Sequence, residues 1–198
     1  MVKPTATKRK KAAVSPDTEI STDLLVNQWK RERPDLDMRA FGLTLRITGL
    51  AMLIGQFGEK VAKRLGLRYS EMLLLHALRR EGEPFVLRPT DILKLLKVTS
   101  GTVTYRVDRL EKMGVVRRIP DPEDRRSMMV QLTALGMQRI DEAVDITVGQ
   151  AAVDLKELVD DEAAFASTTE ALRLINAAYD RTMTAAENPL LHQNPKRK

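Results

Sequence analysis

The chain has 198 residues, 43% of them hydrophobic, which is enough for one domain of ordinary size together with tails. It contains no cysteine, so disulfides, cysteine-ligated zinc and thiol redox sensing are excluded, and its two histidines, His76 and His192, are too far apart to suggest a metal site. The net charge of +6 arises at the two ends, where residues 1–12 and 196–198 hold eight basic and no acidic residues, so the remainder carries −2 and the total charge alone does not indicate a polyanion partner.

Both ends of the chain are too polar to fold alone. We expect residues 1–16 to form a disordered basic tail, with a basic arm that reaches a DNA groove as the open alternative, and residues 188–198 to form a basic C-terminal tail. The charged start is not followed by an apolar segment of the kind found in secretory signals. We therefore expect the protein to be cytoplasmic.

Two helices are expected near the N-terminus, a short one over residues 17–32 and a long one over 37–65. Trp29 of the first helix is expected to dock it on the body, with a contact to a ligand as the alternative. The second carries apolar residues at alternating steps of four and three, the heptad seam of a helix that pairs with another helix. This seam consists of Leu43, Ile47, Leu50, Ile54, Phe57 and Val61. A membrane span is rejected, because Arg46 and Gln56 interrupt the apolar run and four glycines dilute it.

A helix-turn-helix is expected in the middle of the chain. Residues 69–80 form a helix with MLLLHAL at its centre, so His76 is expected at or near the core. Thr90 is expected to cap the helix DILKLLK, and a short link leads into the next helix, residues 99–113. Two helices joined by such a turn, the second with a polar face, form a helix-turn-helix.

The second of these helices has two distinct faces. On one face Val103, Val107 and Leu110 recur at helical spacing, and on the other hydroxyl, phenol and guanidinium groups recur at i, i+3, i+4 and i+7. Such donors and stacking groups suit base edges and phosphates in a major groove better than a core. The polar face consists of Thr102, Tyr105, Arg106 and Arg109, and Gly114 ends the helix.

Two β-rich runs follow, residues 115–119 and 128–132, joined by PDPEDRRS, which favours a turn. The segment VLR at 86–88 could add a third strand. A helix that leads into an arginine-tipped hairpin is a winged helix, so the predicted fold class is mainly α with a small β-hairpin wing. Residues 97–131 hold eight basic and five acidic side chains, whereas 133–170 hold two and nine, a polarity that would orient the body on DNA.

Two further helices are expected after the hairpin. Thr133 caps the first, which runs from residue 134 to about 159, and Asp160 or Asp161 caps the last. Their inner faces carry Ile140, Val144, Val148, Leu155 and Leu158, and then Phe165, Leu172, Ile175 and Tyr179. A lone chain with one small wing would cover these faces poorly, so the N- and C-terminal helices are expected to pair across a homodimer.

The segment from residue 67 to residue 137 resembles the winged helix-turn-helix core of the MarR (multiple antibiotic resistance regulator) family. The specific part is DRLEKMGVVRR, followed by DPEDRRS and then by LTALG. The long helices on either side match the family's dimerisation helices in placement and length. The chain then divides into a basic tail (1–16), N-terminal dimerisation helices (17–66), a winged helix-turn-helix DNA-binding domain (67–132), C-terminal dimerisation helices (133–187) and a basic tail (188–198).

The resemblance places the recognition helix at 100–113 and the wing motif Asp-x-Arg at 124–126. In relatives one wing arginine enters the minor groove and the next braces the wing against the aspartate. We assign Arg125 to the groove and Arg126 to Asp124, because residues two apart on a strand share a face. Tyr105 departs from the family, in which arginine or asparagine is common at that place. The candidate DNA-contacting residues are Thr90, Ser100, Thr102, Thr104, Tyr105, Arg106, Arg109, Asp124, Arg125 and Arg126.

The resemblance further implies a homodimeric transcriptional regulator, most often a repressor, which a small organic effector releases from a palindromic operator in double-stranded DNA. Redox-sensing members use cysteine and zinc-sensing members use histidine and carboxylate clusters, so an aromatic acid or its thioester is favoured here. The candidate ligand-binding residues are Trp29, Arg46, Tyr69, His76, Arg106 and Arg118. Urate-responsive relatives share the tryptophan and two of these arginines, but their acidic residue falls on Leu73, so urate is not assigned.

Two other classes of function compete with this one. A winged helix can serve as a protein-interaction or architectural DNA-binding module without a ligand, and competition between operator and random DNA separates the two. An enzyme is not expected, because the sequence contains no recognisable nucleophile and base pair, phosphate loop or metal cluster, and no cofactor is expected.

Overall fold

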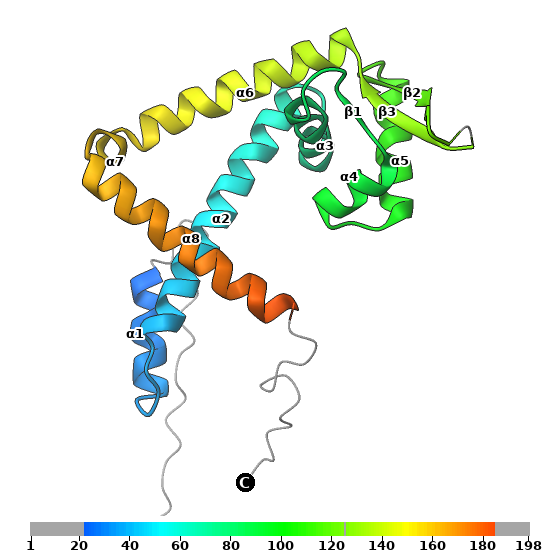
Figure 1. Cartoon of the computed structure of the whole chain (residues 1–198). Coiled ribbons are helices and arrows are strands. Elements are labelled where there is room, and N and C mark those ends of the chain that lie inside the picture. The colour runs from blue at the N-terminus through cyan, green and yellow to red at the C-terminus, as the bar shows by residue number, and fades with distance from the viewer. Residues whose placement is uncertain (1–21, 125, 185–198) are drawn as a thin grey trace, which may run out of the picture. The chain divides into compact units, whose positions relative to one another are not determined.

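A computed structural model describes residues 22–124 and 126–184 (Figure 1). The elements in chain order are α1 (Thr22–Glu32), α2 (Arg39–Arg64), α3 (Tyr69–Arg80), β1 (Val86–Leu87), α4 (Pro89–Leu96), α5 (Ser100–Lys112), β2 (Val116–Pro120), β3 (Met128–Leu132), α6 (Ala134–Asp154), α7 (Lys156–Asp160) and α8 (Glu162–Thr184). The chain divides into two compact units within α2, the first ending at Lys60 and the second beginning at Val61. The predicted fold class, mainly helical with a small β wing, is confirmed.

In the first unit α1 packs on the start of α2. Val26 of α1 is buried and lies against Gly42, where a Cβ atom would stand 3.1 Å from the Val26 Cγ2 atom, so the glycine permits this close approach. Trp29 meets Phe41 edge-on, with ring centres 6.3 Å apart and an angle of 89° between the planes. The tryptophan therefore docks α1 on α2, in agreement with the structural interpretation of this residue.

The apolar face of α2 is uncovered within this unit. Leu50 and Ile54 of the predicted seam expose 54% and 59% of their surface. By length and composition alone α2 is a candidate membrane span, with a mean hydropathy of 1.4 over its most apolar stretch. Arg46, whose guanidinium forms an ion pair with Asp23 of α1, argues against a span, and a second helix with the same seam is the other way to cover this face.

The core of the second unit is built around α3. This helix buries Leu74, Leu75 and Leu78 completely. Each neighbouring element adds at least one residue with 0–1% exposure: Ile92 from α4, Leu110 from α5, Val130 from β3 and Ile140 from α6. His76 lies half-buried beside this core, as predicted, and burial together with the nearby Arg80 lowers its pKa, so the imidazole is neutral at neutral pH.

The three strands form an antiparallel sheet in the order β1-β3-β2 (Figure 1). Val116 pairs with Leu132 and Pro120 with Met128, which defines the hairpin, while Val86 of β1 pairs with Gln131. The predicted third strand beside the wing is therefore confirmed. The sheet lies next to α4 and α5, and this arrangement fixes the wing relative to α5.

Thr133 joins the hairpin to α6 as predicted. Its Oγ1 atom accepts a hydrogen bond from the Gly136 amide at 3.1 Å and donates one to the Gly114 carbonyl at 2.7 Å. A Cβ atom at Gly136 would stand only 2.0 Å from the Val115 carbonyl oxygen, so glycine is required there. Gly114 has φ +71°, a left-handed conformation that glycine adopts without strain, and it ends α5 as predicted.

The predicted cap of α4 is wrong. The helix begins at Pro89, one residue before Thr90, and Arg88 is the N-cap residue without a side-chain capping bond. Proline suits the first helical position because its fixed φ is helical and its missing N–H group would have no partner inside the helix. Thr90 is thus a first-turn residue, and it stays exposed.

The C-terminal helices differ from the prediction in one boundary. The helix expected to reach residue 159 ends at Asp154, and Leu155, with φ −106° and ψ 12°, separates it from the short α7. Asp161 caps the last helix as predicted, since its Oδ1 atom accepts from the Ala164 amide at 3.0 Å. The faces of these helices expose large apolar side chains, among them Val148, Leu155, Phe165, Leu172 and Tyr179.

Candidate DNA interface

The two faces of α5 are arranged as the sequence predicts. The core face is buried, with at most 2% of each side chain exposed, and consists of Val103, Val107 and Leu110. The opposite face points outward. Ser100, Thr104 and Tyr105 on this face are exposed, whereas Thr102 and Arg106 are half-buried. A buried stripe on one side thus sets which polar groups α5 presents on the other.

The outward groups keep hydrogen-bonding capacity. Thr104 Oγ1 donates to the Ser100 carbonyl at 3.2 Å, and Thr102 Oγ1 shares a hydrogen bond of 2.9 Å with Thr99 Oγ1. Each hydroxyl retains a lone pair for an outside donor. Arg106 makes no hydrogen bond or ion pair with any residue in the described part of the chain, so its five donors remain available.

Arg109 makes a contact within the fold that the sequence did not predict. Its Nη1 atom forms an ion pair with Oε2 of Glu71, a completely buried carboxylate on α3, and this bond raises the pKa of Arg109. Glu71 Oε2 also accepts from the Arg68 amide at 2.8 Å. The Arg109 side chain therefore fixes α5 on α3, and its contact with DNA stays a prediction from the sequence. A buried carboxylate with one oxygen lacking a described partner needs this cation nearby.

Arg118 of β2 is also paired with carboxylates of its own chain. Its guanidinium forms ion pairs with Asp108 and Glu111 of α5, and its amide donates to Glu111 Oε1 at 3.1 Å. These carboxylates raise the pKa of Arg118, with the hydrogen bond to Asp108 as the largest cause. The side chain therefore ties the wing to α5, and a ligand carboxylate would have to displace two existing ones.

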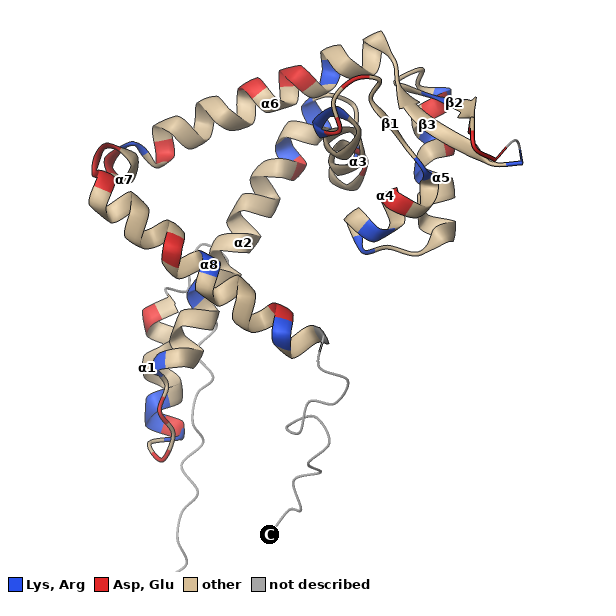
Figure 2. Ribbon diagram, in the orientation of Figure 1, with Lys and Arg blue, Asp and Glu red and all other residues tan. Residues whose placement is uncertain are grey.

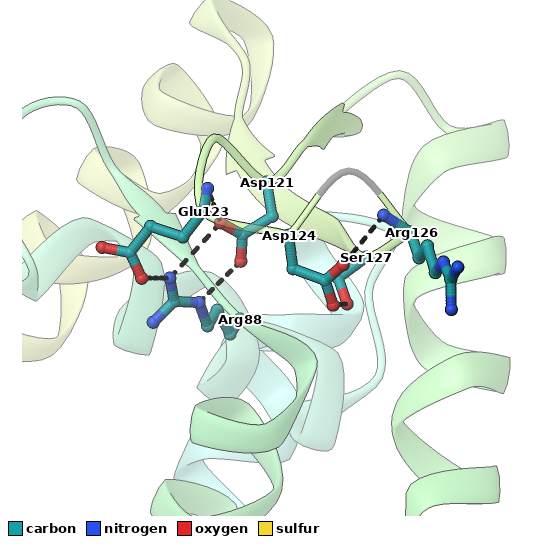
Figure 3. A network of polar contacts seen from close by, with 6 residues as sticks. All are labelled: Arg88, Asp121, Glu123, Asp124, Arg126 and Ser127. Atoms are coloured by element: carbon teal, nitrogen blue, oxygen red, sulfur yellow. Dashed lines mark hydrogen bonds and ion pairs between the residues drawn. The ribbon is translucent and has the colours of Figure 1, made fainter.

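The base of the wing is held by a second arginine, Arg88, which no sequence pattern singled out. Arg88 Nε donates to Asp121 Oδ2 at 2.7 Å, and its Nη2 atom bonds both Asp121, at 3.3 Å, and Glu123 (Figure 3). Asp121 is only 3% exposed. The hydrogen bond from Arg88 lowers the pKa of Asp121 from 3.8 to about 2. This cluster joins the start of α4 to the wing and borders an open hollow of about 470 Å³.

The turn of the wing is organised by Asp124. Its Oδ1 atom accepts from the Arg126 amide at 3.0 Å and its Oδ2 atom from Ser127 Oγ at 2.6 Å (Figure 3). The Arg126 guanidinium points away from Asp124, so the predicted brace between these two side chains is wrong. Asp124 and Arg126 lie outside both strands, so the alternation of strand side chains does not apply to them. Arg125 lies outside the described residues.

Acid should loosen the wing base through Asp121. Because its pKa in the folded protein lies below the unfolded value, its charged form stabilises the fold fully above about pH 4, and this contribution is lost as the pH falls from about 4 to about 2. Asp121→Asn should therefore lower the urea midpoint above pH 4 and flatten its decline below. The control is Asp145→Asn, at an exposed carboxylate on α6. A decline in Asp121→Asn as steep as in the wild type would contradict this role.

The candidate ligand residues are divided between the two units. Trp29 and Arg46 belong to the first unit, where they contact Phe41 and Asp23. The other four belong to the second unit: Tyr69, His76 and Arg106 are half-buried and Arg118 is paired as described. Their role as one binding site therefore stays a prediction from the sequence.

Basic and acidic side chains are concentrated on different elements of the second unit. Figure 2 shows Lys and Arg residues on α5 and at the tip of the wing between β2 and β3, while Asp and Glu residues recur along α6. The acidic residues at the wing base are paired: Asp121 and Glu123 form ion pairs with Arg88, and Asp124 accepts a hydrogen bond from Ser127. The outward donors of α5 and the wing are thus the groups suited to a polyanion.

Comparison with known proteins identifies the family. A model of the MarR family matches residues 65–127. The HTH-type transcriptional regulator PecS of Dickeya dadantii (strain 3937) is 37% identical over 121 residues, which is 61% of this chain and 73% of that protein. The chain belongs to the MarR family. The resemblance based on the DRLEKMGVVRR, DPEDRRS and LTALG motifs is thereby confirmed.

Solved structures of MarR family regulators share the fold. Sco3205 of Streptomyces coelicolor, determined in complex with DNA, superposes with a TM-score of 0.61 at 23% identity and covers 78% of this chain and 94% of its own. BldR of Sulfolobus solfataricus gives a TM-score of 0.55 at 26% identity over 73% of this chain and 96% of its own. As a member of the MarR family, the chain is a DNA-binding transcriptional regulator with a winged helix-turn-helix.

Proposed function

We propose that this protein is a cytoplasmic homodimeric repressor that binds a palindromic operator and leaves it when a small organic ligand binds. The observation that carries the proposal is the outward face of α5 beside the wing, with its exposed hydroxyls and phenol and with Arg106, which has no partner among the described residues. Donors of these kinds read base edges in the major groove. Arg126 and Arg125 of the wing would contact the adjoining backbone or minor groove, Arg125 by prediction from the sequence alone.

Two apolar faces support the dimer. Leu50 and Ile54 of α2 are more than half exposed within the first unit, and Phe165 and Leu172 of α8 are 45% exposed within the second. Large apolar side chains that lie together and exposed on a helix face usually mark a protein interface. Pairing of two chains would set two recognition helices about 34–36 Å apart, one turn of DNA. The same pairing explains why α2 is as apolar as a membrane span.

Release from the operator by a ligand would depend on the spacing of the two recognition helices in the dimer. A ligand that prefers a dimer with another spacing of the recognition helices would lower operator affinity by that difference in binding free energy. The absence of cysteine from the sequence favours an organic effector over an oxidant, and an aromatic acid or thioester is the proposed class. A thermal-shift screen of aromatic acids, coenzyme A thioesters and antibiotics tests this part directly.

Operator specificity tests the function as a whole. Duplexes are selected from random DNA by the full-length protein, and their affinity is compared with that of unselected DNA at physiological salt. A specificity ratio of at least about 10³ is expected for a regulator. A ratio near one would support the architectural or protein-interaction module in place of a regulator.

Arg106→Ala should weaken binding to the selected operator by about 1 to 3 kcal/mol, the usual worth of an arginine that reads guanine. The half-buried, unpaired guanidinium contributes no described contact to the fold, so stability should change little. Fluorescence anisotropy on operator and random duplexes measures both affinities. An equal loss on the two duplexes would reassign Arg106 to a phosphate contact.

A further inference from the structure

A second attachment joins α5 to the start of α3. Arg68, the N-cap residue of α3, donates from Nη1 to Tyr105 Oη at 3.2 Å, and its guanidinium carbon lies 5.6 Å from the centre of the tyrosine ring. A cation within about 6 Å of an aromatic face is attracted to it. Both contacts act on Tyr105, the recognition-helix residue that departs from the usual pattern of the family.

The backbone of Arg68 is itself fixed. Its amide donates to Glu71 Oε2 at 2.8 Å, and the same oxygen accepts from Arg109, one helical turn beyond Tyr105. Glu71 is completely buried, so water does not compete for these two hydrogen bonds to its carboxylate. The start of α3 therefore holds two positions on one face of α5, and the Arg68 side chain extends from a rigid point.

The hydrogen bond between Arg68 and Tyr105 has only one direction. A guanidinium carries donors and no acceptor, so Tyr105 Oη must accept. The hydrogen of the phenol is then left for a partner outside this pair, and 54% of the Tyr105 surface is exposed to meet one. A tyrosine held in this state offers its neighbour a hydrogen-bond donor.

We propose that Arg68 is a positioning residue that makes Tyr105 a donor toward the operator and so sets the preference at one base position. The inference rests on the proposed function, in which α5 lies in the major groove. There guanine, adenine and thymine present acceptors, whereas cytosine presents its N4 donor. The base that Tyr105 contacts is therefore one of the first three, and cytosine is disfavoured.

Binding to single-base variants of the selected operator tests this assignment. The full-length wild type, Arg68→Met, Tyr105→Phe and the double variant are compared. At one position of each half-site the wild type binds the cytosine duplex about fivefold less tightly than the best duplex, the usual worth of one hydrogen bond. Each single variant brings this ratio close to one, and the double variant matches Tyr105→Phe, because both substitutions remove the same contact. Arg80→Met, which removes a charge from the other end of α3, leaves the ratio unchanged.

The other outcomes separate this inference from the proposed function. A sequence-specific wild type whose preferences persist in Arg68→Met overturns the inference and leaves the function standing. An equal loss on every duplex, with a salt slope smaller by about one, assigns Arg68 to a phosphate and also overturns it. A wild type without any preference overturns both. If Arg68→Met does not fold, Arg68→Ala, which also removes the guanidinium and keeps the backbone amide, takes its place, and a cytosine bias that persists in it overturns the inference.

Discussion

The double substitution Leu50→Glu with Ile54→Glu is expected to split the dimer into single chains and to weaken operator binding by at least about 100-fold. The two side chains expose 54% and 59% of their surface in a single chain and lie on the heptad seam of α2. Burying carboxylates against their own copies would cost desolvation and add repulsion. A single chain offers one recognition helix and loses the roughly 10²- to 10⁴-fold gain of two linked contacts. Sedimentation velocity and an operator titration measure both effects.

The matched control places the same two charges on the opposite face of α2. Thr48 and Gln56 are exposed and lie well away from the seam on the helical wheel. Thr48→Glu with Gln56→Glu should remain dimeric and bind as the wild type does. A Leu50 and Ile54 double variant that is still dimeric, with wild-type affinity, would show that this seam is not the interface.

Arg109→Met is expected to lower the free energy of unfolding by about 3 kcal/mol, because it leaves the Glu71 carboxylate buried without its cation. Only the Arg68 amide would remain as a described partner of that carboxylate. Glu71→Gln should cost less, since the Arg109 side chain is 35% exposed and can turn to water. Urea unfolding followed by circular dichroism, at one fixed protein concentration, gives these differences.

Two further variants bracket the effect. Arg106→Met makes the same substitution one turn earlier in α5, where no described ion pair is lost, and should stay within about 0.5 kcal/mol of the wild type. Replacing both partners, Arg109→Met with Glu71→Met, should recover part of the loss because no buried charge remains. Equal stability of Arg109→Met and Arg106→Met would refute the anchoring role of the ion pair.

Local patterns were sufficient for the framework of the fold. The helical spacing of Val103, Val107 and Leu110 predicted the buried face of α5, and Thr133 predicted the start of α6. The two β-rich runs joined by PDPEDRRS predicted the hairpin, and VLR was a candidate for its third strand. The buried face, the cap and the hairpin turn depend on residues within a few positions of each other, so a single sequence is enough to predict them, whereas the pairing of VLR with the hairpin is a contact between distant residues.

The features that local patterns did not predict depend either on a partner distant in the sequence or on the local backbone conformation. Spacing places Arg109 on the polar face of α5, but it could not predict the ion pair with Glu71, which is 38 positions earlier and buried by tertiary packing. Asp121 and Arg88 are likewise 33 positions apart. The side-chain alternation of strands does not apply to Asp124, which lies outside both strands and accepts a hydrogen bond from Ser127 Oγ.

The stoichiometry of the protein on one selected operator duplex is the most direct measurement of whether two paired chains read the DNA. Sedimentation equilibrium of the complex, with the duplex labelled, gives the number of chains bound at saturation. Two chains per palindromic duplex, and one-half of the palindrome bound much more weakly, are the expected results. A single chain that binds either half alone with the full affinity would contradict the paired arrangement.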